Sequence, residues 1–196
     1  MAVISIKNKT KSGSLLNGNA PYIPTDFESI ETVTVGSGGA GTVTFSSIPS
    51  TYSHLQVRYI ARSNRGDVQD IIRFRFNSDS GSNYAYHWLR GDGGTADAGN
   101  GTSTASPWTA IIAGNNAAAN IFGTGVTDIL DYTSTNKNKT LRTLSGVDTN
   151  NADGRIMVLS NLWFATPAAI NSIEIAPNYG TSFNQYSSFA LYGIKG

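Results

Sequence analysis

The chain has 196 residues and a formal net charge of +1, from 14 basic and 13 acidic side chains. This balance excludes an ordinary nucleic-acid-binding protein, which needs an excess of Lys and Arg to neutralise phosphates. Cysteine is absent, so disulfides and every metal or redox site built on thiolates are excluded as well. The length suits one domain, with or without a short arm.

Small polar residues dominate the composition, since Ser, Thr, Asn and Gly together make up about two fifths of the chain. Strong helix formers are scarce, and the Thr, Val, Ile and aromatic residues favour pleated sheet, while Gly, Asn and Ser favour turns. No apolar run approaches the roughly 20 residues of a membrane-spanning helix, and the N-terminus lacks the apolar core of a signal peptide. We therefore expect an all-β protein without membrane insertion.

Residues 1–25 differ from the rest of the chain, because they are basic, carry no acid and end in two prolines, Pro21 and Pro24. Such a segment buries too little apolar area to order itself. We predict an N-terminal attachment arm that a partner protein holds. The residues expected to contact this partner are Ile4, Ile6, Lys7, Lys9, Lys11, Leu15 and Leu16. The alternative is that the apolar residues of this segment add an edge strand to the domain itself.

From residue 30 onward the hydrophobic residues alternate with a period of two, which is typical of β-strands. The segments 32–35 and 42–45 flank a glycine-rich run and predict a hairpin. The polar stretch 91–106 is expected to be the one long loop. The last strand, 186–194, is expected to be central in its sheet, because a C-terminal edge strand would fray. The remaining expected strands are 54–62, 71–76, 84–89, 108–113, 121–130, 139–147, 155–165 and 170–176.

These short and regularly spaced strands leave no room for the crossover helices of a parallel sheet. The sequence therefore predicts a jelly-roll-like antiparallel β-sandwich over residues 26–196, preceded by the extended N-terminal arm of residues 1–25.

No set of residues indicates catalysis. Acyl transfer needs a nucleophile with a histidine and an orienting acid, but the only histidines, His54 and His87, lie at or within expected strands. Glycoside hydrolysis needs two carboxylates across a cleft, and Asp128 and Asp131 are the best pair, although charges at the end of a strand explain them as well. We predict a protein that is not an enzyme and carries no cofactor.

Two loops rich in oxygen ligands leave calcium binding open. The runs 148–153 and 92–97 both begin and end with Asp, but they depart from the spacing of known calcium loops. Turns that need residues tolerant of a left-handed backbone explain both runs equally well.

Tyr84, Tyr86 and Trp88 lie two residues apart and therefore on one side of a strand. Sugars stack on aromatic faces, so these residues are candidates for contact with a glycan. Packing between two sheets is the competing interpretation, because a sandwich core needs large side chains.

Several stretches together resemble a group of small structural proteins of tailed bacteriophages, described as tail-fibre-like or virion proteins. The resemblance lies in residues 4–16, 45–58 and 185–196, with 128–132 and 144–148 between them. It spans nearly the whole chain and implies a class of protein, but it transfers no active-site residue. Such proteins commonly form closed rotational assemblies, above all trimers.

The resulting expectation is a non-enzymatic virion protein that assembles in the host cytoplasm and docks on other capsid or tail subunits through residues 1–25. It would display the sandwich outward as a tail-fibre or receptor-binding module, with a host surface glycan as a further partner. The first alternative is a capsid decoration (cement) protein, favoured by the lack of a shaft between arm and domain. A carbohydrate-binding module or glycan-degrading enzyme is the second alternative.

Overall fold

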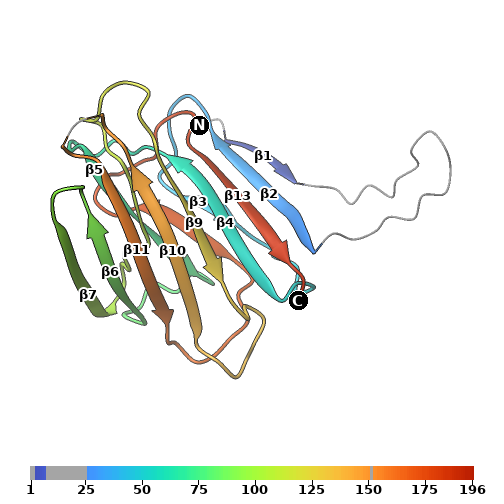
Figure 1. Cartoon of the computed structure of the whole chain (residues 1–196). Helices are drawn as coiled ribbons and strands as arrows, with labels where there is room; N and C mark the ends of the chain where they lie inside the picture. The colour runs from blue at the N-terminus through green and yellow to red at the C-terminus, as the bar shows by residue number, and fades with distance from the viewer. Residues whose placement is uncertain (1–2, 8–25, 151) are drawn as a thin grey trace.

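A computed structural model describes residues 3–7, 26–150 and 152–196 of the chain. These residues form thirteen β-strands in two antiparallel sheets, and no α-helix is present among them (Figure 1). The expected all-β sandwich is therefore confirmed.

The two sheets differ in width. The large sheet has nine strands, in the spatial order β1 (Val3–Lys7), β2 (Phe27–Val35), β13 (Ser188–Ile194), β4 (His54–Ala61), β9 (Gly123–Ile129), β10 (Lys139–Val147), β11 (Arg155–Trp163), β6 (Tyr84–Gly91) and β7 (Ala96–Thr104). The small sheet has four, in the order β3 (Val43–Phe45), β12 (Ile173–Pro177), β5 (Gln69–Phe76) and β8 (Ala110–Ala113). Figure 1 shows the small sheet behind the large one, so one face of the large sheet is left uncovered.

Eight strands are divided equally between the sheets, and consecutive ones change sheet along the chain, except that β5 and β8 both lie in the small sheet. β2, β4, β9 and β13 belong to the large sheet, and β3, β5, β8 and β12 belong to the small sheet. Two additional pairs, β6–β7 and β10–β11, interrupt this alternation and widen the large sheet on one side (Figure 1). The width of the uncovered face therefore comes largely from these two pairs.

The hydrophobic core lies between the sheets, and the period-two alternation places it there. In β4, Leu55, Val57 and Tyr59 point inward and are buried. The Tyr59 ring meets Phe74 of the small sheet edge to face, with the ring centroids 6.4 Å apart. Removal of this apolar surface from water is the main favourable contribution to folding.

The predicted hairpin of residues 32–35 and 42–45 is wrong. β2 pairs with β1 and β13 in the large sheet, whereas β3 pairs with β12 in the small sheet. The glycine-rich run between them carries the chain from one sheet to the other. Gly39 has a φ of +71°, and a Cβ there would lie 2.6 Å from the carbonyl oxygen of Phe183, so this corner requires glycine.

The predicted long loop of residues 91–106 is also wrong, because most of it is strand β7. β7 pairs with β6 and forms an edge of the large sheet. It has poor β-propensity, but its Gly99 and Gly101 lie against the rings of Trp88 and Tyr86, which cover them from β6. This covering, together with the hydrogen-bond ladder, compensates for the sequence of the strand.

The first and last strands of the described chain, β1 and β13, both pair with β2, one on each side of it. β13 lies between β2 and β4, which confirms that the last strand is central. β1 pairs with β2 from Val3 opposite Val35 to Lys7 opposite Glu31. The edge strand left open as an alternative for the N-terminal segment is therefore present over residues 3–7.

Candidate functional site

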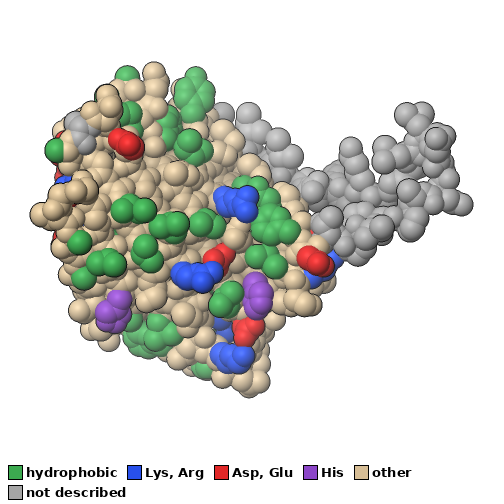
Figure 2. Space-filling model, in the orientation of Figure 1, with side chains coloured by type: hydrophobic (Ala, Val, Ile, Leu, Met, Phe, Trp, Pro, Cys, Tyr) green, Lys and Arg blue, Asp and Glu red, His purple; other side chains and the backbone are tan. Residues whose placement is uncertain are grey.

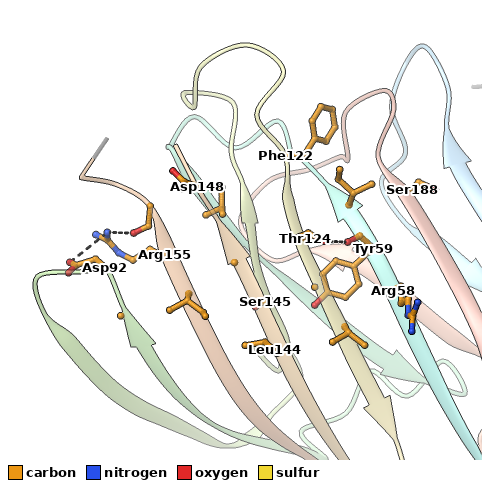
Figure 3. Close-up of a pocket in the computed structure, with 18 of the residues that line it drawn as sticks. Arg58, Tyr59, Asp92, Phe122, Thr124, Leu144, Ser145, Asp148, Arg155 and Ser188 are labelled. Carbon is orange, nitrogen blue, oxygen red and sulfur yellow. Dashed lines mark hydrogen bonds and ion pairs between the residues drawn. The ribbon is translucent and has the colours of Figure 1, made fainter. Parts of the chain in front are cut away.

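The outer face of the large sheet contains a shallow groove, here called the outer-face groove. It crosses β4, β9, β10 and β11 and has a volume of about 1120 Å³ (Figure 3). Its walls are mainly apolar and include Ile60, Val126, Leu144 and Ile156. Figure 2 shows this face, with hydrophobic side chains gathered in a band across its middle.

The pairing register of the strands explains the shape of the outer-face groove. Ile60 of β4 is opposite Thr124, Thr124 is opposite Gly146, and Gly146 is opposite Ile156. All of these positions alternate with buried ones and therefore point outward. Because Gly146 has no side chain, the surface is lower in the middle of this row than at its two ends, where the two isoleucines lie.

A second row of outward positions runs parallel to the first and is more apolar. Leu89, Val158, Leu144 and Val126 are directly opposite one another on β6, β11, β10 and β9. Leu89 is 57% exposed and Leu144 is 48% exposed. A sheet face in water normally presents polar side chains at such positions. A continuous row of apolar side chains is therefore unusual on an exposed face.

One end of the groove carries a fixed negative charge. Asp92 accepts hydrogen bonds from the amides of Thr95 and Gly94 and from the Thr95 hydroxyl, at 2.7–3.0 Å, and its Oδ2 lies 3.6 Å from Arg155 Nη1 (Figure 3). These hydrogen bonds lower the pKa of Asp92 to about 2. A carboxyl group with this pKa stays ionised at neutral pH and does not act as a general acid.

The opposite side of the apolar band carries charges of both signs. Asp128 accepts hydrogen bonds from Gln56 at 2.8 Å and from Arg142 at 3.0 Å. The other carboxylate of the pair considered for glycoside hydrolysis, Asp131, accepts from Lys137 at 2.7 Å. Each carboxylate thus has its own cation and its own neighbours, which is the arrangement of surface ion pairs and not of a shared acid and base.

Tyr59 is among the residues that line the groove, from below. Its side chain points to the core, and a Cβ on Gly125 would collide with its hydroxyl group. Burial raises the pKa of Tyr59, so the phenol is neutral. Gly125 is therefore required by packing beneath the groove.

The three aromatic residues proposed as glycan-facing divide into one core residue and two half-buried ones. Tyr84 is 1% exposed, and its hydroxyl donates to the Asp79 carbonyl at 3.0 Å. The Tyr86 and Trp88 rings stack on Trp108, with centroids 5.7 and 5.9 Å away. These stacks face the inner side of the β6–β7 pair. Packing within the sandwich accounts for Tyr84, whereas contact of the half-buried Tyr86 and Trp88 with a glycan stays a prediction.

The other predicted site residues fall in several places. Ile4, Ile6 and Lys7 belong to β1, while Lys9, Lys11, Leu15 and Leu16 lie outside the described residues. His54 Nδ1 accepts from the Asp131 amide at 3.0 Å, and His87 is exposed on the outer face. Among the described residues, no group of three or more His, Asp or Glu side chains is close enough to hold a metal ion.

Sequence reasoning missed the groove itself. The run Ile156–Leu159 in β11 is apolar at every position, which is typical of a strand covered on both faces. The small sheet covers only one of these faces, so the run is the signal that could have pointed to the groove.

No protein-family model, curated protein or solved structure matches this chain. In the part of the chain that the structure describes, no helix has the length and apolarity needed to span a bilayer.

Proposed function

We propose that this chain is a non-enzymatic structural protein of a tailed-bacteriophage particle, of the tail-fibre or receptor-binding type. The observation that carries the proposal is the outer-face groove: a broad and mainly apolar sheet face that lies open to solvent. Exposed apolar patches of this kind are typical of surfaces that another protein covers. The groove-lining residues include no histidine, and Asp92 is held ionised by its neighbours.

Two further observations support the same class. The division of eight strands between two sheets, with a change of sheet at every step except from β5 to β8, resembles a jelly roll enlarged by two hairpins, and jelly rolls are common in viral capsid proteins. This is an argument by fold analogy. The resemblance of the sequence to phage structural proteins is independent of it.

In this proposal residues 1–25 attach the domain to other virion proteins, and homo-oligomers form on the particle. The basic composition and the prolines of this segment suit an attachment arm. β1 fixes where the segment joins the domain, at an edge of the large sheet and beside β2. The rest of the sandwich is then free to face outward.

The experiment starts from phage particles that carry a tagged copy of the chain. Immunogold labelling should place the tag on the tail, and particles with residues 2–24 deleted from the chain should lose the label. Deletion of the whole chain should then reduce adsorption to cells and leave the heat resistance of heads unchanged.

The capsid decoration protein is the alternative within the same class, and the same particles distinguish it. It predicts label on the head, normal adsorption and heads that burst at lower temperature. Absence of the chain from purified particles would contradict both versions of the proposal.

A further inference from the structure

We infer that the outer-face groove is covered by a second copy of this chain, packed face to face about a two-fold axis parallel to the strands and between β9 and β10. The inference rests on the proposed function, since it names the partner of the surface that the function uses. It specifies a pair, with the same patch contributed by both copies.

The first step is the apolar content of the face. The row of Leu89, Val158, Leu144 and Val126 is continuous across four neighbouring strands, and Ile156 and Ile60 lie in the next row. All but Val126 are 45–57% exposed. Burial of such side chains is favourable by roughly 25 cal/mol for each Å² removed from water.

The apolar pattern of this face is also complementary to the same face of a second copy. Rotation about a line between β9 and β10 brings β10 over β9 of the second copy, β11 over β4, and β6 over β13. Leu144 then faces Val126 of the second copy, and Ile156 faces Ile60. At the margin, Leu89 faces the small side chain of Ala190. Large side chains meet apolar or small ones in each row.

Charged side chains next to the apolar rows are complementary in the same arrangement of two copies. In the row below, Arg142 and Asp128 are opposite each other on β10 and β9. The same rotation places Arg142 of each copy over Asp128 of the other. The Arg142 side chain is 77% exposed, so it can reach across while Asp128 keeps its bond to Gln56. The pair thus becomes a four-membered set of alternating charges.

Arg58 is the cation at the end of the row of Leu89, Val158, Leu144 and Val126, and its neighbours hold its side chain to one side of that row. Its Nε donates to Gln56 at 2.7 Å, and its guanidinium group lies over the rings of Phe27 and Tyr192, 5.0 and 5.4 Å from their centroids. Val158 of the second copy would therefore meet the aliphatic part of Arg58.

The fourth step is area. Six strands from β6 to β13 at a spacing of about 4.8 Å, and roughly seven residues at about 3.3 Å, give a flat face of about 650 Å². Side-chain relief makes the accessible area larger, and a stable interface buries about 800 Å² on each partner. A two-fold axis parallel to the strands keeps the strand directions of the two sheets aligned, within the range of about 30° that face-to-face sheet packing shows.

Sedimentation velocity of the full chain over a concentration series tests the pairing. The expected species is a dimer, and Leu144→Glu should weaken it by about 100-fold or more, because each dimer would bury two carboxylates in an apolar contact. Tyr179→Glu is the matched control: Tyr179 is 51% exposed but follows β12 of the small sheet, away from the outer face, so this variant should dimerise normally.

Exchange of the charges at Arg142 and Asp128 tests the position of the two-fold axis. Arg142→Asp and Asp128→Arg should each be monomeric, since like charges would meet across the axis. A 1:1 mixture of the two variants should form a heterodimer, because one face is then acidic and the other basic. Circular dichroism of each variant shows that the domain remains folded.

Three results would overturn the inference: a wild-type monomer at all concentrations, a trimer that Leu144→Glu leaves intact, or a mixture of charge variants that stays monomeric. These results leave the proposed function untouched if the chain is still found in particles. Conversely, a dimer with the expected variant behaviour but no place in particles would contradict the function and keep the pairing.

Discussion

At the scale of single residues, buried polar side chains hold the loops of the sandwich in place. Arg62, which is 8% exposed, donates to the backbone carbonyls of Asn115, Ala117, Ala118 and Ile121 at distances of 2.7–3.1 Å. Burial lowers the pKa of Arg62, but its guanidinium group remains charged at neutral pH. One side chain thus donates to four carbonyls of the loop between β8 and β9.

Replacement of this residue should destabilise the domain without changing its surface. Arg62→Met removes four hydrogen bonds to carbonyls, of which, in the part of the chain that the structure describes, only the Ala118 carbonyl keeps a bond, from the Ile121 amide. We expect a loss of about 2–3 kcal/mol and a decrease in Tm of about 4–12 °C. Differential scanning calorimetry measures both. Lys137→Met, at an exposed ion pair, should lower Tm by far less; equal effects would show that the loop does not depend on Arg62.

Asp79 has a similar role between β5 and β6, and it makes stability depend on pH. Burial raises the pKa of Asp79, but hydrogen bonds from Trp163, Asn83 and the Gly81 amide together outweigh burial and hold the pKa below its ordinary value. The carboxylate therefore stabilises the fold above the ordinary carboxyl pKa of about 4, and this contribution is lost as the pH falls through the folded-state pKa.

The expected outcome for Asp79→Asn is a loss of about 1–2 kcal/mol at neutral pH, because the Trp163 indole N–H loses its charged acceptor at 2.7 Å. The difference from wild type should shrink as the pH is lowered below about 4. Urea unfolding at several pH values, followed by tryptophan fluorescence, measures this. A difference that grows in acid would contradict the assignment.

At the scale of elements, alternation was enough to predict most strands but not their partners. The pattern of Leu55, Val57 and Tyr59 is visible in the sequence, and the structure confirms it. β7 was missed because Gly99 and Gly101 give no propensity signal, and the aromatic rings that cover them come from another strand. The groove was missed for a related reason: which outward residues become neighbours depends on register, which alternation leaves open.

Substitution at Gly99 should therefore disturb the edge of the sheet. A Cβ there would lie 2.7 Å from the Trp88 ring, so Gly99→Val should displace Trp88 from its stack on Trp108. We expect a changed near-ultraviolet circular dichroism spectrum and faster proteolysis within β7. Ala98→Val adds similar bulk to an exposed position of the same strand and should leave both unchanged; a spectrum altered equally by both variants would argue against the stack.

At the scale of the whole molecule, the large sheet ends in β1 on one side and β7 on the other. β2 keeps its pairing with β13 whether or not β1 is present, because the two ladders lie on opposite sides of β2. β1 therefore protects the backbone edge of β2 that would otherwise be open.

Deletion of residues 1–7 should leave a folded domain with a similar Tm but an exposed edge at β2. We expect aggregation that increases with protein concentration and is visible by light scattering. An unfolded product would show instead that the N-terminal segment is part of the folding unit.

The two added hairpins, β6–β7 and β10–β11, also affect how the residues on the outer face of the large sheet can change. β10 and β11 supply Leu144, Ile156 and Val158, whereas the eight strands shared between the two sheets supply most of the core. A chain with this layout can acquire a new binding preference by exchanging one hairpin, while the scaffold that determines its fold is inherited unaltered.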